Sequence, residues 1–271
     1  MRKIKNGTVA IAFFILAGCS FFHKQETGVD PTSLSQLQNM SSQAGVRFSK
    51  KENNELRLQA IQETALGLGA QGGLAVASRQ IDLYLEKDKS HLDNIFNFDA
   101  MVLSHGVMPP VLVESNNNLN LADPNTIRVS DKTYKIIKQA HFATTPPNWR
   151  DYLWLPYNKP ELPDKVLLPK TAEEREVWRR AVYMGWQSGM QQAYNIFHQS
   201  LARLKRDFQG MVLYRKLLQE KMINPPFVSR TELGVTGNGS VMRINDQVLR
   251  ITELPHLQTD SRNWQAIVVQ S

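Results

Sequence analysis

The sequence predicts an α+β fold that is mainly helical, with a long central helical region and antiparallel β segments in the middle and at the C-terminus. Two long stretches repeat apolar residues at steps of three and four, which is the period of one helix face. Short runs of β-branched residues, separated by Asn, Asp, Gly and Pro, lie between and after them. Because helices and strands occupy separate segments, α+β is favoured over an alternating α/β fold.

The first 18 residues have the pattern of a secretion signal peptide. Arg2, Lys3 and Lys5 form a positively charged start, and the apolar run 9–16 follows it. An uncleaved membrane anchor is the alternative, since no charge interrupts residues 6–22. That run lies at the short edge of the roughly 17–25 residues that span a bilayer, so we favour the cleaved signal peptide.

The signal peptide ends in Leu16, Ala17, Gly18 and Cys19, which resemble the lipobox of bacterial lipoproteins. In that motif the cysteine thiol receives a diacylglyceryl lipid, with palmitate among its acyl chains, and the preceding peptide bond is then cut. We therefore expect cleavage between Gly18 and Cys19 and lipidation of Cys19. Ser20 stands where an aspartate would resemble an inner-membrane retention signal, so the expected location is the periplasmic face of the outer membrane.

Composition excludes several chemistries. Cys19 is the only cysteine, and lipidation would consume it, so the mature protein would have no disulfide, thiol nucleophile, Cys-based zinc site or iron–sulfur cluster. Signal-peptide removal takes away three of the 32 basic residues and none of the 25 acidic ones, which lowers the net charge from +7 to +4. The basic residues are scattered, so direct nucleic-acid binding is not expected.

Residues 20–54 are rich in Ser, Gln, Asn and Lys and show no clear period, which predicts a flexible tether. The predicted organisation is therefore a signal peptide at 1–18, a lipidated N-terminus and tether at 19–54, and a single α+β periplasmic domain at 55–271.

Helical spacing begins after the tether. The first helix is predicted to run to Leu85, and a second, capped by Ser90 with Asp93, to end near Leu103. The apolar face of the first helix is formed by Leu58, Ile61, Ala65, Leu68, Gly72 and Ala75.

Thr171 and Glu174 resemble a capping box that opens a helix running towards Met222. An unbroken helix of that length would measure about 75 Å. We therefore expect a bend or break near residues 194–199 or at Gly210.

The β segments come in two groups. Residues 111–113 predict a strand, residues 116–118 and Asp123-Pro124 predict turns, and 126–130 with 133–137 predict a hairpin around Asp131-Lys132. A short helix at 133–142 is the alternative for the last part. The second group predicts a three-stranded meander with turns at 237–239 and 245–246, and a fourth strand at 264–269.

Residues 67–72 match the G-x-G-x-x-G dinucleotide fingerprint, but that motif needs a strand before it, and the residues before Gly67 have helical spacing. The pairs Gly69/Gly73 and Gly185/Gly189 instead predict close helix packing, because each removes side chains from one helix face. A helix break is the alternative, since each glycine costs about 1 kcal/mol in a helix interior.

No catalytic, cofactor-binding or metal-ligating set is predicted. Glu114-Ser115 resembles the Glu-Ser pair of lytic transglycosylases, yet it follows a strand rather than a helix, so a solvated strand end is favoured. Residues 185–189 have the wrong spacing for a nucleophile elbow. None of the six histidines has a paired ligand spacing: His23, His91, His105, His141, His198 and His256.

Several short stretches, in this order, resemble the DotC/TraI family, lipoproteins of Dot/Icm-type (type IVB) secretion and conjugation systems. They are LGAQGGLA at 68–75, PPV at 109–111, NWRDYL at 148–153, GWQSG at 185–189, RDFQGM at 206–211 and VTG at 235–237.

The resemblance implies a non-enzymatic outer-membrane lipoprotein in the envelope-spanning core complex, without cofactors. It would act in an oligomeric assembly with a DotD-like lipoprotein to place a DotH-like subunit in the outer membrane. Two alternatives stay open at this point: a periplasmic cell-wall-acting enzyme and a pilotin-like chaperone.

Overall fold

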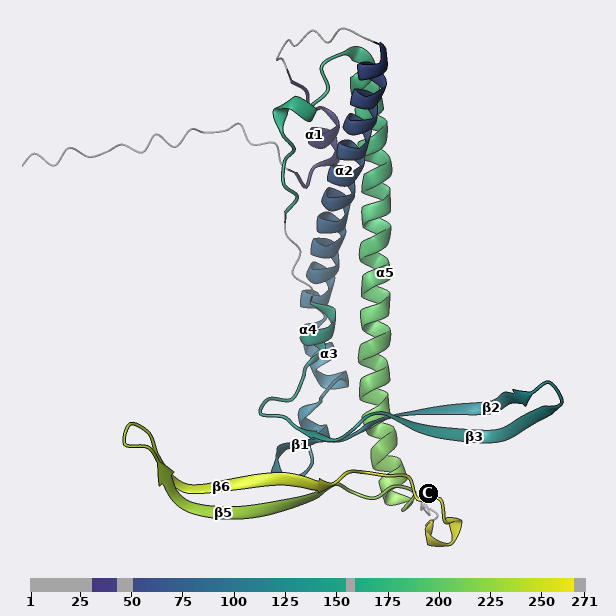
Figure 1. Cartoon of the computed structure of the whole chain (residues 1–271), viewed down its shortest axis with the longest axis vertical. Coiled ribbons are helices and arrows are strands. Elements are labelled where there is room, and N and C mark those ends of the chain that lie inside the picture. The colour runs from purple at the N-terminus through teal and green to yellow at the C-terminus, as the bar shows by residue number, and fades with distance from the viewer. Residues whose placement is uncertain (1–30, 43–50, 155–158, 266–271) are drawn as a thin grey trace, which may run out of the picture.

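Two long helices lie side by side and form the body of the molecule (Figure 1). They are α2 (Lys51–Lys87) and α5 (Ala172–Gln219), and they run parallel, since residues near position 69 contact those near 182 and residues near 73 contact those near 186. The computed structural model describes residues 31–42, 51–154 and 159–265. The predicted α+β class is confirmed.

Shorter elements surround this pair. The helices are α1 (Leu34–Gln38), α3 (Lys89–Ile95) and α4 (Trp149–Leu153), with 3-10 turns at Asp99–Met101, Ser104–Gly106, Lys165–Leu167 and Ser261–Asn263. The strands are β1 (Val107–Met108), β2 (Val111–Asp123), β3 (Thr126–Lys138), β4 (His141–Phe142), β5 (Phe227–Gly237) and β6 (Met242–Glu253). They form three separate antiparallel pairs, β1–β4, β2–β3 and β5–β6. None of the described helices is both apolar and long enough to cross a bilayer.

Glycines let the backbones of the two long helices come into direct contact. A Cβ atom at Gly69 would collide with the Val182 carbonyl, and one at Gly185 would collide with the Leu66 carbonyl. The predicted close packing is confirmed, and the alternative helix break is wrong. The same contact is made on both helices by Gly69, Gly73, Gly185 and Gly189.

Part of the stretch predicted as a tether is packed. Helix α1 inserts Leu37, which is fully buried, and the Trp178 indole N–H donates to the Leu37 carbonyl at 2.7 Å. This contact joins α1 to α5, so at least residues 31–42 of the predicted tether belong to the folded body. The signal peptide and Cys19 lie outside the described residues.

The N-terminal ends of α2 and α5 are joined by an ion pair. Glu174 completes the predicted capping box with Thr171, and its carboxylate also accepts from the Arg57 guanidinium at 2.8 Å. Burial alone would raise the pKa of Glu174, but the hydrogen bonds from Arg57 and the backbone hold it below its usual value.

Helix α5 continues without interruption, so the predicted break is wrong. Its apolar face drifts around the helix and meets a new partner at each level: Trp178 packs with α1 and α2, Leu204 with the α4 region and Leu217 with Ile223. Gly210 marks a close approach rather than a break, because a Cβ there would collide with the Leu112 backbone of β2.

The second predicted helix is shorter than expected. Helix α3 ends at Ile95, and only a 3-10 turn continues towards Leu103. The rings of Phe96 and Phe98 both pack edge-on against Phe208 of α5, with centroids 5.5 and 5.3 Å apart. Those ring contacts turn the chain away from its helical path.

Strands β2 and β3 form one long hairpin rather than several short strands. The predicted turn at Asp123-Pro124 is confirmed, and the Asp123 carboxylate accepts from the Asn125 N–H at 2.8 Å. The turn predicted at Asp131-Lys132 and the alternative helix at 133–142 are wrong, because Asn116 pairs with Lys132 across the hairpin. The predicted turn at 116–118 is only a strand irregularity, with a positive φ at Asn117.

The C-terminal meander has two strands instead of the predicted three. The turn at 237–239 is confirmed. The turn predicted at 245–246 is wrong, because Asn245 lies inside β6, where it has a positive φ of 56° beside a register shift. Of the fourth strand predicted at 264–269, Trp264 caps a 3-10 turn and residues 266–269 lie outside the described chain.

Candidate functional site

The two long hairpins extend as arms to opposite sides of the C-terminal end of α5 (Figure 1). We call β2–β3 the first arm and β5–β6 the second arm. The first begins where Val111 and Leu112 are buried against α5, and the second follows the end of that helix. Their distal halves reach away from the helical body.

The distal half of the first arm has one aliphatic face. Leu119 is paired with Val129 and Leu121 with Ile127, and directly opposed residues share a face of a hairpin. These four side chains are 60–73% exposed. The reverse face is polar, with Asn120 opposite Arg128 and another polar pair beside it.

The second arm also exposes aliphatic side chains near its tip. Val235, Met242 and Ile244 are 65–70% exposed, and Leu233 and Val241 are about half exposed. Arg243 stands between two of these residues and pairs with Thr236, so strand alternation places both on the other face. Each arm is therefore amphipathic at its distal end.

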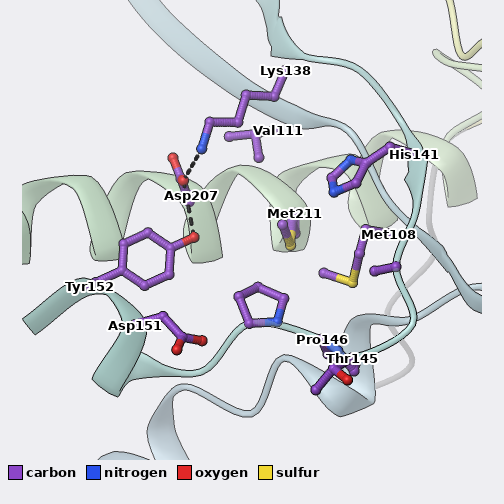
Figure 2. Close-up of a pocket in the computed structure, with 12 residues that line it drawn as sticks. Met108, Val111, Lys138, His141, Thr145, Pro146, Asp151, Tyr152, Asp207 and Met211 are labelled. Atoms are coloured by element: carbon purple, nitrogen blue, oxygen red, sulfur yellow. Dashed lines mark hydrogen bonds and ion pairs between the residues drawn. The ribbon is translucent and has the colours of Figure 1, made fainter. Parts of the chain in front are cut away.

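A cavity of about 530 Å³ lies where the first arm joins α4 and α5 (Figure 2). Met108, Val111 and Met211 contribute apolar walls, and Lys138 and Asp207 contribute charge. Lys138 comes from the end of β3 and Asp207 from α5, so the cavity exists only because the arm is seated on that helix.

Asp207 is buried, and both oxygens of its carboxylate accept hydrogen bonds. Its carboxylate accepts from Lys138 and from the Tyr152 hydroxyl at 3.1 Å (Figure 2). It also accepts from the Arg206 guanidinium at 2.9 Å. Burial would raise the pKa of Asp207, but the hydrogen bonds from Lys138 and Arg206 outweigh it and hold that pKa below its usual value. Burial and the neighbouring Asp207 charge raise the pKa of Tyr152, so its hydroxyl stays protonated.

This arrangement holds several elements together. The Asp207 carboxylate is neutralised by Lys138 and Arg206 and also accepts from the Tyr152 hydroxyl, so donors from three elements hold it. Among the described residues, no group of His, Cys, Asp or Glu is placed to hold a metal ion. Asp207 therefore ties the first arm and α4 to α5.

A second cavity, of about 590 Å³, is mostly apolar and lies between the end of α2, α3 and the middle of α5. Its walls include Ile81, Leu85, Leu92 and Phe197, with Tyr84 at its exposed edge. Asp88, Tyr194 and His198 add polar groups to its lining.

Comparison with known protein families matches residues 55–266 to the family described as type IV secretory system, conjugal DNA-protein transfer. The chain belongs to this family. The resemblance to the DotC/TraI family is thereby confirmed, and the protein is a component of a type IV secretion or conjugation system. A search of curated proteins gave no match.

Four of the six stretches that carry the family resemblance lie at the contacts described above, whereas VTG at 235–237 lies on the second arm. LGAQGGLA and GWQSG hold the glycines of the α2–α5 contact, and RDFQGM holds Asp207 and Gly210. NWRDYL forms α4, where Asn148 and Asp151 make a capping box and the Trp149 indole donates to Asp93 at 2.7 Å. In this member of the conjugal-transfer family these motifs therefore build the scaffold.

Glu114 lies on the first arm, within β2. Its carboxylate pairs with Lys132 across the first arm at 3.0 Å. It also lines a surface depression of about 450 Å³ beside α5, in which it is the only acidic residue among the lining side chains. The predicted solvated strand end is wrong, because Glu114 lies inside β2, which continues to Asp123, and its side chain is 26% exposed.

The other motifs are also accounted for. Residues 67–72 lie within α2, with helix on both sides, so the strand that a dinucleotide fingerprint requires is absent there. Gly18 and Cys19, the predicted cleavage and lipidation sites, lie outside the described residues, as does His23.

Two functional features were missed from the sequence, namely the aliphatic arm faces and the Asp207 cluster. Alternation of aliphatic and polar residues at 118–121 and 127–130 is the signal that could have revealed the first arm face. Asp207 had no such signal, since its partners Lys138 and Tyr152 are 69 and 55 residues away.

Proposed function

We propose that this protein is an outer-membrane lipoprotein and a non-catalytic structural component of a type IVB secretion core complex. In this role it helps to place a DotH-like subunit in the outer membrane, together with a DotD-like lipoprotein. The family match over residues 55–266 carries the proposal. The exposed aliphatic arms support it, because surfaces of that kind mark protein contacts.

The positions of anchor and arms suit such a role. Residues 19–30 would connect the lipid to the packed segment that begins at residue 31, and 12 residues span at most about 40 Å. Helix α1 contacts α5 at Trp178, whereas the first arm contacts it at Gly210, 32 residues further on, or about 48 Å along the helix. The anchored end would stay near the membrane while the arms contact periplasmic partners.

Replacing the lipid acceptor tests the proposal. We expect Cys19→Ser to remove the protein from the outer-membrane fraction, mislocalise the DotH-like subunit and abolish substrate transfer. Mass spectrometry of the wild-type N-terminus should show an acylated Cys19 and no residues 1–18. Ser20→Ala is the matched control and should leave all three readouts unchanged.

The enzyme alternative is tested in the same strain. Glu114→Gln should leave assembly and transfer intact, because that carboxylate only pairs with Lys132. An unmodified Cys19, or loss of transfer in Glu114→Gln with the assembly unharmed, would overturn the proposal.

A further inference from the structure

The distal aliphatic faces of both arms lack a partner within the described chain. None of these side chains belongs to the three core clusters. A lone two-stranded hairpin is marginally stable in water, and three or more strands or a packed face are usually needed. Seven aliphatic side chains form these faces: Leu119, Leu121, Ile127 and Val129 on the first arm, and Val235, Met242 and Ile244 on the second.

The bilayer is a poor partner for these faces. Each arm is only two strands wide, so the outer edge of each strand presents backbone N–H and C=O groups that lipid cannot satisfy. The reverse faces also carry Arg128 and Arg243 close to the tips. A protein surface can pair with such edges and leave the arginines in water, so the occupant is a protein.

The directions of the two arms favour a second copy of this chain. A head-to-tail contact needs two different complementary patches on one molecule, and the arms supply two aliphatic faces on opposite sides of the same end (Figure 1). If the first arm of one copy meets the second arm of the next, each inner copy has both faces covered. Contacts of this type close into a ring or continue as a filament.

Charge and area are compatible with that contact. The first arm carries four basic and three acidic residues and the second carries three of each, so the arms do not repel strongly. A fully exposed aliphatic side chain offers roughly 100 Å². Seven that are 60–73% exposed then offer on the order of 500 Å², which is about half of the apolar area in a standard interface of about 1,600 Å².

We propose that the aliphatic face of the first arm packs against that of the second arm of a neighbouring copy. This contact deepens the structural role proposed above and rests on it. It assigns the arms to assembly between copies of the chain and leaves the helical body free for other subunits.

Thiol crosslinking of the full chain in its native envelope tests the contact. The double variant Leu121→Cys with Ile244→Cys should give a ladder of dimers, trimers and larger species with a short bis-maleimide. Each single variant should remain monomeric, and the two singles co-expressed should stop at dimers. Wild-type protein, whose only cysteine is Cys19, is the control for crosslinking through that thiol. The reverse-face pair Asn120→Cys with Arg243→Cys should stay monomeric.

The outcomes separate the possible partners. Dimers from either single variant would show that like arms meet, and adducts with another protein would show a different partner. No ladder from the double variant, with both thiols labelled by a monofunctional maleimide, would also overturn the contact. If the ladder fails while wild-type protein still fractionates with the outer membrane and places the DotH-like subunit, only the arm contact is wrong. A ladder formed by protein absent from the outer membrane would instead contradict the proposed function.

Discussion

At the scale of single residues, Asp207 links three elements. Its carboxylate brings together Lys138 from β3, Tyr152 from α4 and Arg206 from its own helix. A buried carboxylate is costly without such partners, and here hydrogen bonds from two cations keep it ionised. The seating of the first arm on α5 therefore depends on this charge.

We expect Asp207→Asn to lower stability at neutral pH by about 1–3 kcal/mol, because it leaves donors unsatisfied while Lys138 and Arg206 keep much of their solvation. The pKa of Asp207 is lowered in the folded state, so its contribution is complete above the unfolded-state value near 3.8 and is lost as the pH falls below it. Thermal unfolding from pH 7 to pH 3 measures this. The difference in melting temperature between wild type and variant should shrink below about pH 4, and a constant difference would argue against the assigned role.

At the scale of elements, the parallel contact between α2 and α5 depends on missing side chains. Each contact glycine faces a backbone carbonyl of the other helix, so the helix axes come closer than side chains would allow. Gly67 is different, because a Cβ there would meet nothing within 4 Å. Gly69 is therefore required for the helix contact, whereas Gly67 is not.

This difference gives a matched pair of variants. Gly69→Ala should destabilise the protein by about 1–3 kcal/mol, because the new methyl group collides with the Val182 backbone. Gly67→Ala should be neutral or stabilise by up to about 1 kcal/mol, because alanine is the better helix former at an exposed position. Chemical denaturation of both variants measures the effect, and equal destabilisation would contradict the helix contact.

At the scale of the whole molecule, a helical body carries two arms that contribute little to its core. The three core clusters lie along α5, and the buried part of the first arm ends near Leu112. The distal arm residues are exposed on both faces. Stability and assembly therefore reside in different parts of the chain.

Shortening the first arm separates the two properties. Replacing residues 116–132 with Asn-Gly joins Ser115 to Thr133, which are paired across the hairpin, through a favoured two-residue turn. We expect the melting temperature of the purified domain to stay within a few degrees of wild type, because no core residue is removed. Assembly in the envelope should be lost. A large fall in melting temperature would show that the distal arm supports the body.

The sequence by itself was sufficient for features that depend on neighbouring residues. The 3.6-residue period located α2 and α5, the Thr171/Glu174 pair located the start of α5, and Gly-Asn-Gly located the tip of the second arm. The glycine pairs predicted close packing because side-chain removal at helical spacing acts on one face. The family assignment also came from short motifs in order, and the comparison confirmed it.

Only the tertiary structure decided features that depend on residues far apart in the chain. Helix α5 stays unbroken because α1, α4 and β2 cover its drifting apolar face in turn, which no local pattern shows. Asn116–118 and Asp131-Lys132 favour turns locally, yet cross-strand pairing from Ser115–Thr133 to Asn118–Ser130 keeps both inside one hairpin. Local propensity is worth about 1 kcal/mol per residue or less, so a ladder of long-range hydrogen bonds and side-chain pairs outweighs it.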